Sequence, residues 1–256
     1  MLKRVQHDTF VTNKHFNSST FQLINHLKKT FGRLFAFTPI KNFMTLEFKS
    51  VLPFPLREYP HVNESVWKRD FLLEFPSKIL LNASSGKGKS TFVNIVYGVR
   101  SDYDGSVFIN QRDISKLTLH EWIDLRRTSL SVIFQDLQLF GELTLWENLI
   151  LKNQLTNHKA LTEIEDMLTL LGIGDRKSQI CKTLSLGQQQ RVAIIRSLLQ
   201  PFDLLLMDEP FSHLDEENAK IALALITAET EKNKAGFILT SLGSRHGATY
   251  DKELKL

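Results

Sequence analysis

The stretch NASSGKGKST, residues 82–91, has the composition of a loop that wraps around phosphate groups. The usual pattern of such a loop is a glycine, four free positions and then Gly-Lys-Ser or Gly-Lys-Thr. Gly88, Lys89 and Ser90 satisfy the end of the pattern, but Ala83 stands where its first glycine is expected. Because Ala83 comes where the preceding strand leaves the sheet, we expect one methyl group to be tolerated there if its φ angle is negative.

The rest of this loop supplies the groups that a nucleotide requires. Gly86 and Gly88 lack a Cβ, so backbone N–H groups can converge on phosphate oxygens. Lys89 has the length to reach the β- and γ-phosphates, and Ser90 can place its hydroxyl on Mg²⁺. The N-terminus of the helix that follows favours anions. We expect nucleotide contacts from the whole loop: Ser85, Gly86, Lys87, Gly88, Lys89, Ser90 and Thr91.

Strands and helices alternate along the chain from Met44 onward. Residues 78–82 (KILLN) are typical of a short buried strand that enters the phosphate loop, and residues 91–97 are typical of a helix that Gly98 can end. Further buried strands are expected at 204–207 and 237–240. This alternation predicts an α/β fold with a mostly parallel sheet that is covered on both sides.

Local signals predict where several elements begin and turn. Asp104-Gly105 indicates a hairpin turn before a strand at residues 106–109. Capping boxes are expected to open two helices, at Thr118 with Glu121 and at Thr144 with Glu147.

A second motif, LLLMDEP (204–210), is an apolar strand that ends in two acids and a proline. The first acid, Asp208, can hold Mg²⁺ through water, and the second, Glu209, can accept a proton from an attacking water. An ordinary strand end with solvated acids is the alternative, but it does not account for acids placed between four apolar residues and a proline.

Between these motifs lies LSLGQQQR (184–191), and here the sequence resembles the ATP-binding cassette (ABC) family, whose signature is LSGGQ. Leu186 replaces the first of the paired glycines, and the other positions match: Leu184, Ser185, Gly187 and Gln188. The resemblance extends to Gln135 in VIFQD and to SHLD (212–215), so five motifs follow one another in the order of the family. It implies a P-loop NTPase core with an antiparallel β subdomain and an inserted helical subdomain at about 137–190.

The resemblance also implies a mechanism. Two copies face each other head to tail, and each ATP lies between the phosphate loop of one copy and Ser185, Gly187 and Gln188 of the other. Gln135 contacts Mg²⁺ together with Ser90 and Asp208, and it takes part in catalysis with Glu209. An aromatic residue upstream of the loop stacks on the adenine, for which Tyr59 is the candidate against the alternative of a plain loop tyrosine.

One departure from the family concerns catalysis. Members normally carry a Thr-His pair after the last catalytic strand, whereas this chain has Thr240-Ser241. A serine hydroxyl can donate a hydrogen bond but cannot carry a positive charge. We therefore expect slow ATP hydrolysis with dimerisation retained. His246 is either a replacement for the missing histidine or a surface loop residue.

Residues 1–43 form a basic, Phe-rich extension before the domain at 44–256. The first fifty residues hold eight basic and two acidic side chains, a net charge of +6 against +4 for the whole chain. Apolar residues recur at helical spacing behind a possible capping box at Ser19 and Gln22. Three interpretations stay open: a helix on an anionic membrane surface, a packed helix or poorly ordered leader, or translation that starts at Met44.

Composition bounds the location. Hydrophobic content of 42% and charged content of 23% are typical of globular proteins. The single cysteine, Cys181, excludes an intrachain disulfide and suits a reducing cytosol. With neither a signal peptide nor a run of roughly 20 apolar residues, we expect a protein on the cytoplasmic face of the membrane.

Three functions compete on these grounds. The first is the ATPase subunit of a transporter with a separate transmembrane permease, because QDLQLFGELTLWENLILK (135–152) resembles the lipoprotein-release, macrolide-efflux and cell-division branch. The resemblance implies a groove for a helix of that permease, and six apolar residues are candidates to line it, although some of them must simply be core: Leu137, Leu139, Phe140, Leu143, Leu145 and Trp146. The second, an ATPase on nucleic acid or ribosomes, lacks zinc cysteines and a tandem cassette. The third is a degenerate cassette that serves as a nucleotide-gated interaction module.

Overall fold

The computed structural model describes residues 43–58 and 65–256. Tyr59 and the predicted helix of the N-terminal extension therefore lie outside the described residues. No helix in the described ranges combines the length and the apolar character needed to cross a membrane.

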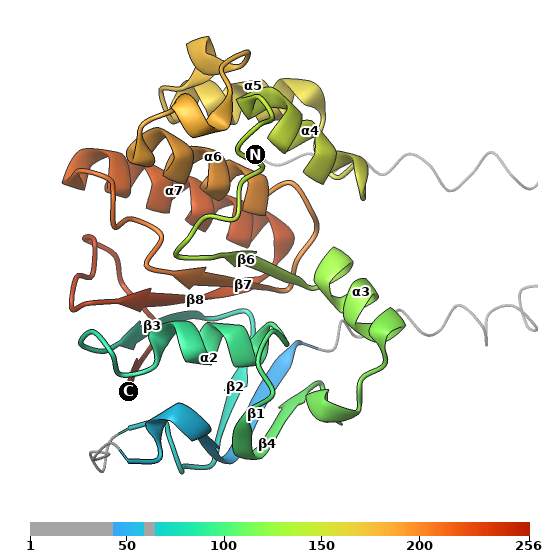
Figure 1. Cartoon of the computed structure of the whole chain (residues 1–256), viewed down its shortest axis with the longest axis vertical. Coiled ribbons are helices and arrows are strands. Elements are labelled where there is room, and N and C mark those ends of the chain that lie inside the picture. The colour runs from blue at the N-terminus through green and yellow to red at the C-terminus, as the bar shows by residue number, and fades with distance from the viewer. Residues whose placement is uncertain (1–42, 59–64) are drawn as a thin grey trace, which may run out of the picture. The chain divides into compact units, whose positions relative to one another are not determined.

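Two sheets organise this domain (Figure 1). The antiparallel sheet has the order β2-β1-β4-β5 and is built from β1 (Thr45–Pro53), β2 (Phe71–Glu74), β4 (Tyr103–Ile109) and β5 (Arg112–Asp113). The parallel sheet has the order β6-β7-β8-β3-β9 and is built from β3 (Lys78–Asn82), β6 (Leu130–Ile133), β7 (Leu204–Asp208), β8 (Gly236–Ser241) and β9 (Lys252–Lys255). The predicted α/β fold with an antiparallel subdomain is confirmed.

Helices cover both faces of the parallel sheet, α2 on one face and α6 and α7 on the other (Figure 1). The α-helices are α2 (Lys89–Val96), α3 (Leu119–Thr128), α4 (Leu145–Gln154), α5 (Leu161–Leu170), α6 (Leu186–Ser197) and α7 (Glu216–Asn233). The short 3₁₀ helices are η1 (Phe54–Leu56), η2 (Ile114–Lys116), η3 (Gly174–Arg176) and η4 (Cys181–Thr183).

The apolar runs of the central strands follow from this layering. In β3, Ile79 and Leu81 pack into the core that contains α2, whereas Leu80 packs into the core on the opposite face. Successive side chains of a strand point to opposite faces, so a strand covered on both sides must be apolar at every position. Strands β7 and β8 are also buried along their whole length, and β7 ends in Asp208, which Glu209 follows.

The predicted capping boxes are present at the starts of two helices. Thr118 with Glu121 and Thr144 with Glu147 form the expected capping boxes of α3 and α4. Helix α2 begins two residues earlier than predicted, at Lys89, because Gly88 takes a left-handed conformation and caps it. The N–H groups of the first turn of α2, which have no partner within the helix, therefore lie at the end of the phosphate loop.

The predicted hairpin turn at Asp104-Gly105 is wrong. Both residues lie within β4, opposite a register shift in β1. A Cβ on Gly105 would come within 2.4 Å of the Lys49 carbonyl oxygen, so the glycine permits a close approach of two strands. The turn falls instead at Asn110 and Gln111, which both have positive φ angles before β5.

Candidate functional site

The phosphate loop connects β3 to α2 and is shaped by its glycines. Gly86 and Gly88 have φ angles of 76° and 98°, which side chains with a Cβ rarely adopt. A Cβ on Gly88 would lie 2.7 Å from the Leu56 Cδ1 atom. Ala83 is absent from the described residues with positive φ, and its N–H donates to the Ser241 carbonyl oxygen at 3.2 Å. The condition for tolerating alanine is therefore met.

Lys89 is held inside the loop by three oxygen atoms. Its side chain is 5% exposed, and Nζ donates to the carbonyl oxygens of Ala83 and Ser84, each at 3.1 Å. Nζ also lies 3.2 Å from the Glu209 carboxylate, which is the acid that follows β7. The lysine is thus paired with the predicted catalytic acid and is placed where phosphate oxygens can replace that partner.

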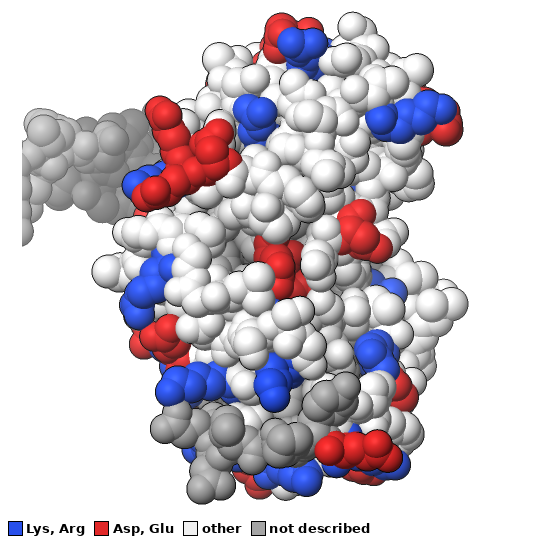
Figure 2. Space-filling model, turned by 60° about the vertical axis from the view of Figure 1, so that its left-hand side comes forward, with Lys and Arg blue, Asp and Glu red and all other residues white. Residues whose placement is uncertain are grey.

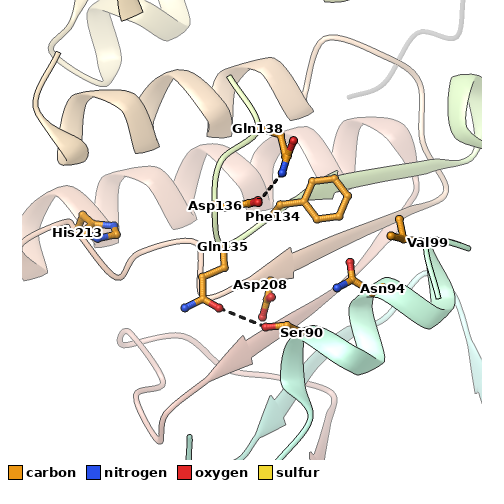
Figure 3. Close-up of a pocket in the computed structure, with 9 residues that line it drawn as sticks. All are labelled: Ser90, Asn94, Val99, Phe134, Gln135, Asp136, Gln138, Asp208 and His213. Carbon is orange, nitrogen blue, oxygen red and sulfur yellow. Dashed lines mark hydrogen bonds between the residues drawn. The ribbon is translucent and has the colours of Figure 1, made fainter. Parts of the chain in front are cut away.

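Ser90, Gln135 and Asp208 point toward one another from three elements (Figure 3). Ser90 lies in the first turn of α2 and donates through Oγ to Gln135 Oε1 at 3.2 Å. Asp208 ends β7 and accepts a hydrogen bond from the Thr240 hydroxyl at 2.8 Å. Hydroxyl, amide and carboxylate oxygens are the donor set that Mg²⁺ prefers, so these residues fit the ion.

Burial raises the pKa of the Asp208 carboxyl, and the nearby Glu209 carboxylate acts in the same direction. Hydrogen bonds from Ser90 and Thr240 and the charge of Lys89 oppose this rise. A divalent cation beside the carboxylate would offset the cost of burying its negative charge. A cation bound at this place would therefore stabilise the ionised form of Asp208.

Two hollows meet at this point. A cavity of about 390 Å³ is lined by most of the predicted nucleotide residues, namely Ser85, Gly86, Gly88, Lys89, Ser90, Thr91, Gln135 and Glu209. Pro55, Leu56 and Leu242 line it as well. The side chain of Lys87 does not line this cavity. Its carbonyl oxygen accepts a hydrogen bond from Trp67 Nε1 at 3.2 Å, which holds the backbone of the loop in place. A larger hollow of about 730 Å³ shares Ser90 and Gln135 with the first and extends past Asp208 to His213.

The signature residues Ser185, Gly187 and Gln188 lie at the start of α6. Ser185 caps this helix, accepting from the Gln188 N–H at 3.3 Å, and the Gln188 side chain accepts from the Ser185 N–H at 2.9 Å. Ser185 is exposed, and none of Ser185, Gly187 and Gln188 lines either hollow of the same chain. A Cβ on Gly187 would lie 2.8 Å from the His213 carbonyl oxygen, so glycine lets the loop at 212–215 pass against the signature.

Ser241, where the resemblance leads us to expect a histidine, is the last residue of β8. Ser241 is buried, and its hydroxyl donates to the Ser244 carbonyl oxygen at 2.7 Å, so its proton is already used within the loop. His246 is half-buried and its ring packs edge-on against Phe211, at 4.8 Å between centroids. Burial lowers the pKa of His246. Both residues line a small hollow that also reaches Glu209.

The roles of two residues at the site, Thr240 and Gln190, were missed by sequence reasoning. Thr240 accepts from the Glu209 N–H at 3.0 Å while it donates to Asp208, so one hydroxyl fixes both acids. Gln190 donates to the Glu209 carbonyl oxygen at 3.2 Å and accepts from the His213 N–H at 2.8 Å. The sequence placed Gln190 and His213 within two motifs of the site, but it did not indicate that Gln190 bonds to both His213 and Glu209.

The six apolar residues expected to line a groove are mostly core. Leu137 and Leu145 are buried, and Leu139 and Trp146 pack against the same core. Phe140 alone among the six lines the hollow beside α4, together with residues that lie further along the chain. The expectation that some of the six belong to the core is met, because α4 turns Leu145 inward.

Comparisons with known proteins decide the family. Residues 71–212 match the ABC transporter family. The chain is 31% identical over 196 residues to the lipoprotein-releasing system ATP-binding protein LolD of Treponema denticola, and the match covers 74% of this chain and 85% of LolD. This chain belongs to the ABC transporter family. The cassette is also 34% identical over 151 residues to the macrolide export ATP-binding/permease protein MacB of Vibrio parahaemolyticus, covering 58% of the cassette and 23% of MacB.

Solved structures agree with the observed fold of the cassette. It matches the dimeric structure of MJ0796, a bacterial ABC transporter cassette, with a TM-score of 0.70 and 22% identity, over 82% of this cassette and 94% of MJ0796. A post-hydrolysis state of MJ0796 bound to ADP and Pi matches with a TM-score of 0.63 and 25% identity, over 76% and 87% of the two chains. The family and the fold that the motifs predicted are confirmed.

Proposed function

We propose that this protein is the ATP-hydrolysing subunit of a transporter or a related membrane machine whose transmembrane permease is a separate chain. The observation that carries the proposal is the 3.2 Å pair between Lys89 and Glu209 at the wall of the phosphate-loop cavity. A triphosphate that enters this cavity takes the place of Glu209 beside Lys89. The carboxylate is then free to orient a water molecule and to accept its proton as the water attacks the γ-phosphate.

The remaining groups of the site hold the substrate. The N-terminus of α2 and Lys89 bind the phosphates, and Ser90, Gln135 and Asp208 would hold Mg²⁺. When bound, Mg²⁺ neutralises charge on the β- and γ-phosphate oxygens. Thr240 fixes Asp208 and Glu209 relative to each other, since its hydroxyl donates to the Asp208 carboxylate and accepts from the Glu209 backbone N–H.

A second copy completes the site in this proposal. Ser185, Gly187 and Gln188 offer N–H groups at the start of α6 but lie outside the hollows of their own chain. A triphosphate bound by one cassette would therefore be capped by the signature of its twin. MJ0796, a cassette of the same fold, was solved as a dimer, which supports the pairing of two copies.

Hydrolysis is proposed to be slow. Ser241 stands where the family has a histidine, and its hydroxyl is bonded to Ser244 rather than directed at the cavity. No imidazole from this position stabilises the γ-phosphate in the transition state. ATP would then keep the dimer closed for longer than in relatives that carry the histidine.

The proposed location is the cytoplasmic face of a membrane, with the protein held there by its permease. LolD and MacB, named for lipoprotein release and macrolide export, support a membrane task of this kind. Nucleic acid is not a proposed partner. Acidic and basic side chains are mixed on the face shown in Figure 2, whereas a nucleic-acid surface is expected to gather basic residues on one face.

The test is a Glu209→Gln variant, which keeps the shape of the acid but cannot accept the proton. We expect the purified variant to lose ATPase activity by about 100-fold or more and to form a dimer with ATP. With ATP in membrane extracts it should also co-purify with a transmembrane protein. Recovery of the protein alone, with no membrane partner, would contradict the transporter proposal.

A second function has one specific observation in its favour. Leu186 and Ser241 both depart from the family consensus, and Leu186 is 56% exposed at the signature. These changes suit a nucleotide-gated interaction module that closes on ATP without turnover. Undetectable hydrolysis by the parent protein, with ATP-dependent dimerisation, would favour this alternative.

A further inference from the structure

The hollow of about 730 Å³ contains a histidine that the proposed mechanism does not use, His213. The three residues that would hold Mg²⁺ line the same hollow: Ser90, Gln135 and Asp208. Figure 3 shows His213 at the left of the view, on the loop that follows β7, with Gln135 and Asp208 nearer the centre. Among the histidines that the structure describes, His213 alone lines this hollow, and it is exposed. Its ring is therefore open to a ligand that binds beside Ser90.

The backbone of His213 is fixed on two sides. Its N–H donates to Gln190 Oε1 at 2.8 Å, and Gln190 is a fully buried residue of α6. Its carbonyl oxygen lies against Gly187, where a Cβ would come within 2.8 Å. Gln190 also donates to the Glu209 carbonyl oxygen at 3.2 Å. His213 is therefore held in a defined position relative to the acid that is proposed to activate water.

The hydrogen bonds around the ring indicate which nitrogen carries the proton. Ser212 Oγ lies 3.1 Å from His213 Nδ1, and the same Oγ accepts a hydrogen bond from Gln190 Nε2 at 3.4 Å. A hydroxyl that accepts from an amide is polarised to donate its own proton, here to Nδ1. A neutral imidazole that accepts at Nδ1 carries its proton at Nε2. His213 thus presents an N–H donor at Nε2, which has no hydrogen-bond partner among the described residues.

Ser241 and His246 do not supply such a donor. The Ser241 hydroxyl donates to the Ser244 carbonyl oxygen at 2.7 Å, and the His246 ring packs edge-on against Phe211. Both residues line a separate hollow, which does not include the oxygen atoms that would hold Mg²⁺. The imidazole that faces the Mg²⁺ end of the site is therefore the one on the SHLD loop.

We propose that His213 is a γ-phosphate-binding residue, which donates a hydrogen bond from Nε2 to a γ-phosphate oxygen of the ATP bound by the same chain. This inference rests on the proposed function, and it adds a residue that distinguishes ATP from ADP. Ser90 and Gln135 line both hollows, so a γ-phosphate at their junction faces His213. A hydrogen bond to a charged phosphate is among the stronger ones, and ADP has no γ-phosphate oxygen to accept it.

The test uses full-length protein in the Glu209→Gln background, which binds ATP without consuming it, and titration with Mg²⁺-ATP and Mg²⁺-ADP. His213→Gln and His213→Asn are a matched pair, because the amide nitrogen of glutamine lies near the position of Nε2 and that of asparagine near the position of Nδ1. We expect His213→Asn to weaken ATP binding about tenfold and to change ADP binding less than about twofold, whereas His213→Gln retains most of the ATP affinity. His120→Ala, on an exposed histidine of α3, should change neither affinity. Retained ADP binding shows that the variants fold.

A spectroscopic measurement separates direct contact from an indirect effect. The imidazole NMR signal that His213→Asn removes should shift when ATP is added and stay in place with ADP. The affinity loss should persist when Ser185→Arg is added to weaken dimerisation. Disappearance of the loss in that background would assign His213 to the site of the second copy and overturn the proposal.

Two further outcomes would contradict the role of the Nε2 donor. Equal losses of ATP and ADP affinity would show that His213 only supports the loop, and equal losses in His213→Asn and His213→Gln would show that no donor at Nε2 is needed. Failure of the Glu209→Gln protein to bind either nucleotide refutes the proposed function, whereas ATP binding that His213→Asn leaves unchanged refutes only this inference.

Discussion

Lys89 and Ser185 are expected to contact the same triphosphate, yet their surroundings differ. Lys89 is 5% exposed and its ammonium group is near three oxygen atoms of its own chain. Ser185 is exposed, and its side chain bonds only within the first turn of its own helix. One chain thus builds the phosphate-loop half of the site completely, and it leaves the signature half open. Under the proposed function, ATP binding is expected to be a property of the monomer, and closure of the site a property of the pair.

The largest effect is expected from Lys89→Met. The variant loses the cation that neutralises the phosphates and leaves Glu209 without its partner, so ATPase activity should fall about 100- to 1,000-fold. Lys87→Met is the matched control, because it removes a positive charge from the same loop but not from the cavity wall. Nucleotide affinity and steady-state hydrolysis measure the effect. Equal losses in the two variants would show that the loop needs charge but no particular lysine.

The second-largest effect is expected for dimerisation in Ser185→Arg, which places a bulky cation at the exposed start of α6. In the Glu209→Gln background, ATP should bind to the monomer with little change, but the ATP-dependent dimer should weaken about 100-fold. Size-exclusion chromatography and nucleotide titration separate these two quantities.

Thr144→Arg provides the control for the lost helix cap, because Thr144 forms the same capping box at the start of α4. It should cost about 1 kcal/mol of stability and leave dimerisation intact. Loss of ATP binding in Ser185→Arg would mean that the signature contributes to the site of its own chain.

A smaller gain is expected from Ser241→His. An imidazole that reaches the γ-phosphate should raise turnover at saturating ATP about tenfold. Removal of His246 by alanine substitution in the same background should not change that rate if the half-buried ring has only a packing role against Phe211. An unchanged rate in Ser241→His would contradict the proposal that this position limits hydrolysis.

The smallest effect concerns stability without nucleotide. The folded state raises the pKa of Asp208, so the folded protein holds this proton more tightly than the unfolded chain and loses stability as pH rises above the ordinary value of 3.8. Asp208→Asn should therefore be more stable than the parent by about 1 kcal/mol at pH 7, with the difference vanishing below pH 4. Urea denaturation at several pH values measures this, and a difference independent of pH would contradict the electrostatic cause.

Predictions from the sequence were confirmed where the residues that determine an element lie within one short segment. KILLN predicted β3 because a strand covered on both faces must be apolar throughout, and Thr118 with Glu121 predicted a helix start because the two residues bond to each other. It failed at Asp104-Gly105, where the need for glycine comes from a carbonyl oxygen of Lys49 on another strand. It left open which of the apolar residues at 137–146 belong to the core, since the burial of Leu145 depends on how α4 packs against α6.

The sequence by itself determined the residues of the phosphate loop, the acids after β7, the signature and the family, because each is a local pattern of residue types. Only the tertiary structure decided that Lys89 pairs with Glu209, that Thr240 joins the two acids, and that Gln190 holds His213. These contacts link residues far apart in the chain, and their distances follow from the packing of two sheets and their helices. Local sequence patterns thus identify the chemical groups of the site, and tertiary packing determines which of these groups contact one another.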